Sequence, residues 1–358
     1  MLVYLSSFLL SITIAVGVKK KSLKCGMRTY SLFWVAMIPL TVVSVLRYKV
    51  GTDYTFYLEN QFQFIMNLKK PDYWQVLDYE IGFKKLVEFC GFRLGDVELF
   101  FPIVAFIFML FITFYISDLS ENVVLSIFVF FTSCFFNFSF NIIRQTFATA
   151  IFLYAIRYMY RREVIKYLLC ILLASTFHKT AIIYIFVYFA VNIQIKTYLR
   201  YLVIPVVYAL QFSVKNFIIF LCNTFDFYKG YVDTALSETS QFPISLTLAY
   251  VGIYLLIIVF VPEEERNIRL GKIYSLLETL SIIVVLCGSI AQESTRIIYM
   301  FFPIYIVSIP YWFNRFKKTK IANFGKYCVM MLLIYIYIYY IPMNNYGDTL
   351  PYQTIFMK

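Results

Sequence analysis

The chain has 358 residues, of which 61% are hydrophobic and 15% charged, with a mean hydropathy of +0.74 and a net charge of +12. A soluble domain is about half apolar and about a quarter charged, so it cannot hide this much apolar surface from water. The 39 Phe and 32 Tyr exclude a disordered chain, and seven cysteines without a spacing pattern exclude a secreted disulfide scaffold. We therefore expect an all-α, polytopic integral membrane protein.

Apolar stretches that approach the length of a membrane crossing recur along the whole chain. A helix needs about 20 mostly apolar residues to cross the hydrocarbon, and about twelve segments are predicted as transmembrane helices of one membrane domain over residues 1–358. Lys215 and Asn216 interrupt the stretch 200–222, which is either one span or a span plus an interfacial piece. The approximate centres of the spans are 2–18, 30–47, 99–117, 123–140, 143–160, 164–177, 180–194, 200–212, 244–261, 273–291, 297–313 and 327–342.

The distribution of positive charge sets the expected orientation. Lysines 19–21 follow the first apolar segment, and Lys and Arg collect on the cytoplasmic side of membrane proteins. With that end inside, 19 of the 32 Lys and Arg residues fall in cytoplasmic loops. Both termini are therefore predicted outside. The basic balance reflects this rule, and no nucleic-acid-binding motif accompanies it.

Two predicted outer segments, about 48–98 and 213–243, are too long to be simple turns. Residues 79–95 mix apolar and charged positions at roughly helical spacing, which predicts a helical loop lying along the outer membrane interface. Long loops in compact membrane proteins are often functional.

Polar side chains within or beside the spans gather on the predicted outer side. An ionised group deep in a membrane helix costs roughly 2.5–3.5 kcal/mol on insertion scales, so such groups usually face a cavity or a partner. Their origin in four separate parts of the chain predicts one outer site. The residues are Arg47, Lys49, Asp53, Asn137, Asn141, Arg144, Gln145, His178, Lys179, Gln292, Glu293 and Arg296.

Three arginines of this set, Arg47, Arg144 and Arg296, predict an anionic ligand. The guanidinium fork matches phosphate oxygens with two parallel hydrogen bonds and keeps its charge at any working pH. Each arginine alone also fits an interfacial anchor. Arg296 also stands three residues after Glu293, which fits a local ion pair.

Two residues are candidates for proton transfer. His178, the single histidine, fits a proton acceptor, a donor to phosphate or a hydrogen-bonded structural residue. Asp53 follows Gly51 and fits either a base for a sugar hydroxyl or an ion pair with Lys49; Glu80 and Glu293 are similar candidates. Aromatic residues that could stack on sugar rings, or form an interfacial belt, are Tyr54, Tyr57, Tyr73 and Trp74.

Metal and cofactor chemistry is not expected. A single histidine excludes zinc sites built from two histidines, and the chain has no Asp-x-Asp pair for a metal-bound sugar nucleotide. Glu263, Glu264 and Glu265 are assigned to a solvated cytoplasmic loop.

Four short motifs together resemble the EpsG family, which belongs with the Wzy-type polymerases of bacterial O-antigen, capsule and exopolysaccharide. A late Arg296 at the start of a span follows them, and the resemblance covers roughly residues 1–315. The motifs are Lys49-Val50-Gly51-Thr52-Asp53-Tyr54, Glu80-Ile81-Gly82-Phe83, Ile143-Arg144-Gln145-Thr146-Phe147-Ala148 and Ala174-Ser175-Thr176-Phe177-His178-Lys179-Thr180-Ala181.

The resemblance implies a glycosyltransferase on the outer face of the bacterial cytoplasmic membrane. Such an enzyme moves a growing glycan from undecaprenyl diphosphate to the next lipid-linked repeat unit, without a nucleotide sugar or metal. A chain-length regulator and a flippase are the further partners it implies. His178 or Asp53 would take the proton, Arg144, Arg296 and Arg47 would hold the diphosphate, and the supporting residues would be Gln145, Lys179, Glu80 and Glu293.

Other membrane functions remain open on the sequence. A flippase for the same lipid-linked oligosaccharide would also bind diphosphate through Arg, but it should show cationic groups along a whole translocation path. An O-antigen ligase could use the same roles for arginine and histidine. A membrane acyltransferase would need His178 on the cytoplasmic side, and a structural or receptor role would leave Arg144 unexplained.

Overall fold

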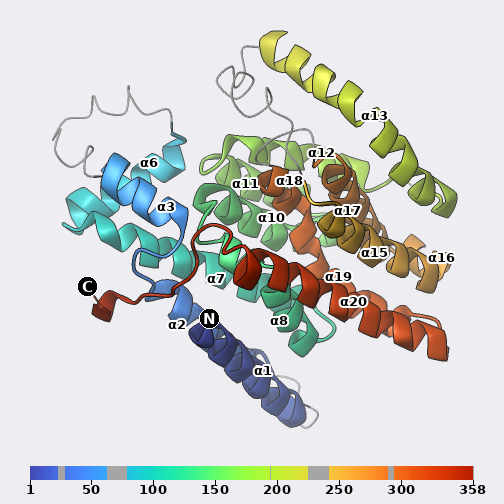
Figure 1. Cartoon of the computed structure of the whole chain (residues 1–358), viewed down its shortest axis with the longest axis horizontal. Coiled ribbons are helices and arrows are strands. Elements are labelled where there is room, and N and C mark those ends of the chain that lie inside the picture. The colour runs from blue at the N-terminus through green and yellow to red at the C-terminus, as the bar shows by residue number, and fades with distance from the viewer. Residues whose placement is uncertain (23–28, 63–78, 194, 225–241, 289–293, 358) are drawn as a thin grey trace. The chain divides into compact units, whose positions relative to one another are not determined.

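The structure is a computed structural model that describes residues 1–357 except 23–28, 63–78, 194, 225–241 and 289–293. The described residues form helices joined by turns, and no strand occurs among them (Figure 1). Arg47 and Thr354 form an isolated antiparallel β-bridge, which is not part of a sheet. The prediction of an all-α protein is confirmed.

The chain divides into two compact units. The first comprises residues 1–189, 309–311 and 337–358, and the second comprises 190–308 and 312–336. Motifs at residues 49–54, 80–83, 143–148 and 174–181 all fall in the first unit.

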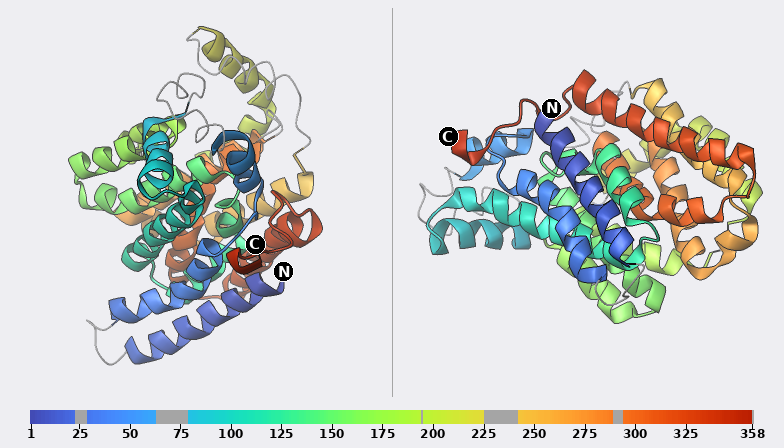
Figure 2. Two further views of the ribbon diagram at one scale, coloured as in Figure 1. Left: turned by 90° about the vertical axis from the view of Figure 1, so that its left-hand side faces the viewer. Right: turned by 90° about the horizontal axis from the view of Figure 1, so that it is seen from below.

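Long apolar helices form the body of the first unit. The first two helices lie side by side along most of their length (Figure 2). The second packs on α7, α7 on α10, and α10 on α11, while the first also contacts α8. These helices are α1 (Leu2–Ser22), α2 (Thr29–Val45), α7 (Phe100–Leu119), α8 (Val123–Thr132), α10 (Ile143–Arg161) and α11 (Val164–Ser175).

The described parts of the predicted outer segment 48–98 are largely helical. The mixed sequence 79–95 forms α6 (Ile81–Glu88) and the π-helical η2 (Phe89–Arg93), with Phe83, Val87 and Cys90 buried. Apolar residues at this spacing share one helix face, which explains the burial. The remaining elements are α3 (Thr52–Thr55), η1 (Phe56–Phe62) and η3 (Val97–Leu99).

The predicted span 123–140 is broken. Helix α8 ends at Thr132, Cys134 takes a left-handed conformation with φ of 62°, and a short helix α9 (Phe135–Phe138) follows. Residues 131–141 are all buried. Non-helical backbone at membrane depth is tolerated where protein surrounds it. The break lets the chain turn within the first unit, directly before the start of α10.

The predicted spans 164–177 and 180–194 are also shorter than expected. Helix α11 ends at Ser175, and the chain continues through η4 (Lys179–Ile183) into α12 (Tyr184–Ala190). His178 stands in extended backbone at the turn between α11 and η4.

The second unit contains most of the remaining helices. Helix α13 (Thr197–Thr224) continues through Lys215, so the uncertain stretch 200–222 is one helix and the loop predicted from 213 begins later. Residues 225–241 of that loop lie outside the described residues. The other elements are α15 (Ile244–Phe260), α16 (Glu263–Asn267), α17 (Arg269–Leu286), α18 (Ser294–Phe301), η5 (Phe302–Ile304), α19 (Tyr305–Arg315) and α20 (Lys320–Ile338).

Three helical stretches of the described chain are long and apolar enough to cross a membrane. They are Val97–Leu119, Thr295–Arg315 and Lys320–Met343. Shorter apolar helices of 10–17 residues are Leu2–Val18, Phe33–Val45, Val123–Thr132, Val164–Ser175, Lys179–Ala190 and Ile244–Phe260. The membrane character of the chain agrees with the sequence, while the number of crossings stays a prediction.

Candidate functional site

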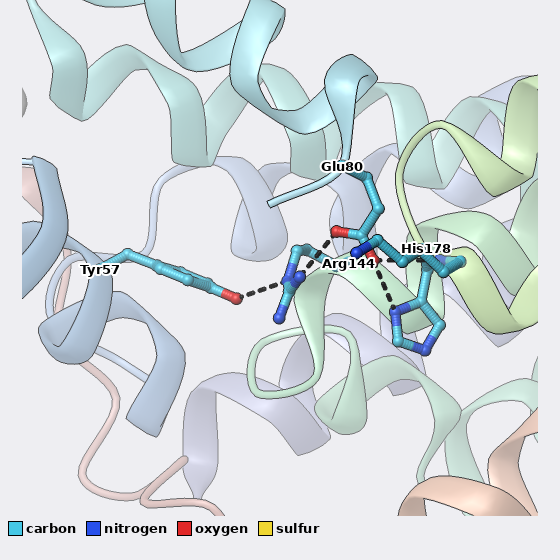
Figure 3. Close-up of polar contacts among 5 residues, drawn as sticks. Tyr57, Glu80, Arg144 and His178 are labelled. Atoms are coloured by element: carbon cyan, nitrogen blue, oxygen red, sulfur yellow. Dashed lines mark hydrogen bonds and ion pairs between the residues drawn. The ribbon is translucent and has the colours of Figure 1, made fainter. Parts of the chain in front are cut away.

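Arg144, the second residue of α10, meets two other segments of the first unit. Its Nη1 donates to Oε2 of Glu80 at 2.7 Å, and its Nε donates to the hydroxyl of Tyr57 at 3.1 Å (Figure 3). The guanidinium carbon lies 4.7 Å from the ring centre of Tyr79. The Arg144 side chain is 26% exposed. An arginine held on several sides yet reachable from outside is suited to binding an anion.

Glu80 lies between Arg144 and the segment that carries His178. Its Oε1 accepts the backbone N–H of Lys179 at 3.0 Å, and Nδ1 of His178 lies 3.6 Å from the same oxygen, just beyond hydrogen-bond distance. The Glu80 side chain is 6% exposed. The sequence therefore folds so that one carboxylate faces both an arginine and the single histidine.

The environment of Glu80 keeps it ionised. Burial alone would raise its pKa, but the adjacent His178 ring, the charge of Arg144 and the Lys179 amide outweigh burial and lower the pKa to about 2. At neutral pH Glu80 therefore carries a full negative charge opposite Arg144.

A close backbone contact brings Glu80 to His178. The carbonyl of Thr176 accepts the N–H groups of Gly82 at 2.7 Å and Phe83 at 3.4 Å, at the start of α6. A Cβ at position 82 would overlap Oγ1 of Thr176 and lie 2.9 Å from its carbonyl oxygen. Glycine is therefore required for this approach. The motifs around residues 80 and 176 form one contact.

A second contact joins residues 51–53 to residues 140–143. Gly51, with φ of 94°, packs against the carbonyl of Phe140 so closely that a Cβ would overlap it. The backbone N–H and hydroxyl of Thr52 donate to Oδ1 of Asn141 at 2.8 and 3.2 Å. Asp53 Oδ2 accepts the N–H of Ile143 at 2.9 Å. A carboxylate is favoured at a helix N-terminus, so Asp53 holds α10 one residue before Arg144.

The ion pair expected as an alternative between Asp53 and Lys49 does not form. Lys49 lies 3.4 Å from Glu59 and forms the ion pair there, while Asp53 accepts the Ile143 amide. Tyr57, expected as a stacking residue, accepts a hydrogen bond from Arg144 through its hydroxyl. Tyr54 is buried and stacks on Phe101 with ring centres 3.8 Å apart. Tyr73 and Trp74 lie outside the described residues.

The other predicted site residues occupy different surroundings. Gln145 is buried next to Arg144, and the side chain of Lys179 is exposed. Arg47 is 2% exposed: its Nη1 donates to the Ser44 carbonyl at 3.0 Å and its guanidinium lies 4.5 Å from the Phe140 ring centre. A diphosphate could reach Arg47 only after these contacts open, so its binding role stays a prediction.

Arg296 belongs to the second unit, where it is half-buried in α18. Its meeting with Arg144 stays a prediction, and Glu293 lies outside the described residues. Tyr79 was missed by sequence reasoning, although it directly precedes Glu80. Among the described residues, no group of three His, Cys, Asp or Glu side chains is close enough to hold a metal ion.

The model of one protein family, described as the EpsG family, matches residues 30–354 and so nearly the whole chain. The chain belongs to the EpsG family. EpsG is a Wzy-type polymerase family, so the resemblance seen in the four motifs is confirmed. No curated protein and no solved structure matches the chain. The four segments 49–54, 80–83, 143–148 and 174–181 lie within the matched range, and their contacts build the site around Arg144.

Proposed function

We propose that this EpsG protein is an oligosaccharide repeat-unit polymerase. It transfers a growing glycan from undecaprenyl diphosphate to the next lipid-linked repeat unit on the outer face of the cytoplasmic membrane. The observation that carries the proposal is the row of Arg144, Glu80 and His178, drawn together from three separate segments of a membrane protein. Family membership supports the class of reaction.

Arg144 is assigned to the leaving group. As the bond from the anomeric carbon to the diphosphate oxygen breaks, the electron pair stays on the diphosphate and negative charge grows there. A fixed cation at that position lowers the barrier, typically by a few kcal/mol for one donor. Glu80 and Tyr57 take Nη1 and Nε of Arg144, so we assign the diphosphate to Nη2. The exposed Lys179 supplies a second positive charge in the same region.

His178 is assigned to the acceptor. The sugar hydroxyl of the next repeat unit forms the new bond to the anomeric carbon, and its proton passes to Nε2 of His178. Glu80 faces Nδ1 and so orients the ring with Nε2 directed away from it. Of the two predicted bases the geometry favours His178, because the Asp53 carboxylate already accepts the Ile143 amide.

The proposal includes one membrane domain with about twelve crossings and both termini on the outer side. The hydroxyl of Tyr4 donates to the carbonyl of Thr349 at 2.8 Å, which brings the two ends of the chain together. Residues 46–52 lie against the same C-terminal segment. This proximity supports placing the termini and the candidate site on one side. A flippase and a chain-length regulator are the protein partners that such a polymerase would work with.

Deletion of the gene, followed by gel analysis of surface polysaccharide, tests the function. A polymerase requires that only single-repeat products remain. Loss of all surface glycan with cytoplasmic build-up would instead indicate a flippase, and free polymer not joined to its lipid core would indicate an O-antigen ligase.

Complementation of the deletion strain then tests the site. Arg144→Ala should leave the protein in the membrane and abolish polymer, because the developing charge loses its cation. Arg93→Ala is the matched control, since Arg93 is an exposed arginine at the end of η2. Normal ladders of long chains with Arg144→Ala would refute the assigned role.

A further inference from the structure

The C-terminal tail, residues 344–357, lies antiparallel to residues 46–52 in the first unit. The N–H of Ile355 donates to the carbonyl of Leu46, and the N–H of Tyr48 donates to the carbonyl of Gln353, both at 3.0 Å. Further along, Gly51 and Thr52 donate to the carbonyls of Asp348 and Gly347, both at 3.1 Å. Figure 1 shows the tail in red beside the blue segment that follows α2. Four backbone hydrogen bonds therefore join the tail to the segment that leads into Asp53.

Hydrogen bonds to α1 and α2 anchor the same tail. The Tyr4 hydroxyl donates to the carbonyl of Thr349 at 2.8 Å, and the Tyr352 hydroxyl donates to the carbonyl of Val43 at 2.9 Å. Within the tail, the Asn345 amide bonds the Leu350 backbone in both directions at 2.8 Å. The tail is thus a built part of the first unit, with Thr349 fully buried.

Gly347 brings the tail into contact with the site. It has φ of 73°, and a Cβ there would overlap the side-chain amide of Asn141. That amide accepts both donors of Thr52 through Oδ1. The amide also donates from Nδ2 to the Asn137 carbonyl at 3.4 Å. The Asn141 side chain therefore cannot move aside without breaking hydrogen bonds on both of its polar atoms.

We propose that the C-terminal tail is a positioning element of the glycan-transfer site, with Gly347 as its central residue. The inference rests on the proposed function. The tail bonds Gly51 and Thr52 on one side, and Asn141 bonds Thr52 on the other. The next residue, Asp53, accepts the N–H of Ile143 at the start of α10. Together these contacts fix the start of α10 and the approach of Arg144 to Glu80. A displacement of about 1 Å at such a site can cost about 100-fold in rate.

A matched pair of glycine substitutions tests the inference. Gly347→Ala adds a methyl group that displaces Asn141, whereas Gly95→Ala adds one at the similar φ of 78° with nothing within 4 Å. The positive-φ strain is therefore shared, and the contact with Asn141 is not. Each protein, carrying an N-terminal tag, is purified in detergent and given the lipid-linked repeat unit extracted from the deletion strain.

We expect Gly347→Ala to lower kcat per folded molecule by about tenfold or more, with KM within about twofold of the parent value. Gly95→Ala should keep the parent kcat. Truncation after Met343 should give a larger loss of kcat than Gly347→Ala. Should Gly347→Ala not accumulate, Tyr4→Phe decides, because it removes only the hydroxyl that binds the Thr349 carbonyl. That variant should lower kcat by about twofold to fivefold without a change in KM.

The inference is overturned if Gly347→Ala, or Tyr4→Phe where Gly347→Ala does not accumulate, has the same kcat as Gly95→Ala. It is also overturned if a smaller amount of folded protein accounts for the whole loss of activity. Arg144→Ala runs in parallel and separates the two proposals. If Arg144→Ala is inactive while the tail variants are active, the tail inference alone fails. If Arg144→Ala still polymerises, both the assigned site and the tail inference fail.

Discussion

At the scale of the residue, the shape of the Arg144 side chain matters as much as its charge. Its guanidinium bonds Glu80 and Tyr57 through two different nitrogens and lies over the Tyr79 ring. Lysine keeps the charge but has one nitrogen on a flexible stem, so it cannot hold this orientation. We expect Arg144→Lys to lower the rate of polymer formation by about 100-fold, the magnitude typical of one lost transition-state donor.

The rate per folded molecule, measured in purified protein, checks this prediction. Arg93→Lys serves as control, because Arg93 is exposed. A rate for Arg144→Lys close to that of the control would show that charge alone suffices.

Glu80 gives a pH-dependent contribution to stability. Its pKa in the folded protein is about 2, against a usual value of 4.5. The ionised carboxylate therefore stabilises the fold fully above about pH 4.5, and this contribution is lost as the pH falls towards 2. Glu80→Gln should lower the melting temperature in detergent at pH 7, and the difference from the parent protein should shrink below about pH 4.5. A difference that stays constant from pH 7 to pH 3 would contradict the ionised role of Glu80.

The sequence identified most of these residues, but not their pairing. Arg144, Glu80 and His178 were recognisable as polar groups in an apolar chain. That Lys49 pairs with Glu59, and that Asp53 holds the Ile143 amide, follows from contacts between residues far apart in sequence. Spacing along the chain does not determine such contacts.

At the scale of the element, Gly82 sets how closely two segments approach. Gly82 at the start of α6 meets Thr176, where a Cβ would overlap Oγ1. Gly82→Ala should push α6 from the turn that carries His178, and overpacking of this kind costs typically about 1–3 kcal/mol. We expect a lower melting temperature and a loss of polymer that exceeds the loss of folded protein.

Gly17→Ala is the control for this substitution, because Gly17 lies in α1 with nothing within 4 Å of an added Cβ. Alanine is favoured over glycine in a helix interior, so Gly17→Ala should be neutral or slightly stabilising. Equal effects of the two substitutions would show that the approach of Gly82 to Thr176 is not required.

The break after α8 could not be predicted from the sequence. Residues 123–140 read as one continuous apolar run, and hydropathy measures composition without regard to backbone direction. The left-handed Cys134 and the turn at 139–142 depend on burial among the surrounding helices of the first unit. Residues 131–142 contain no glycine or proline that would have indicated the turn.

At the scale of the whole molecule, composition determined the class of protein, and four motifs determined the family. Those motifs interlock in pairs within the first unit, 51–53 with 140–143 and 80–83 with 176–179. The scattered motifs of the sequence are therefore one structural feature. Arg296 lies in the second unit, and its meeting with this feature stays a prediction.

The membrane side of that feature is testable by labelling. Arg93 lies in the segment predicted outside, and Lys318 lies in a loop predicted inside; both side chains are exposed. In a parent protein whose seven cysteines are replaced, a membrane-impermeant maleimide should label the Arg93→Cys variant in intact spheroplasts. The Lys318→Cys variant should be labelled only after permeabilisation. The reverse pattern would place Arg144, Glu80 and His178 towards the cytoplasm, away from a substrate assembled on the outer face, and the polymerase assignment would then fail even though the contacts among the three residues remained.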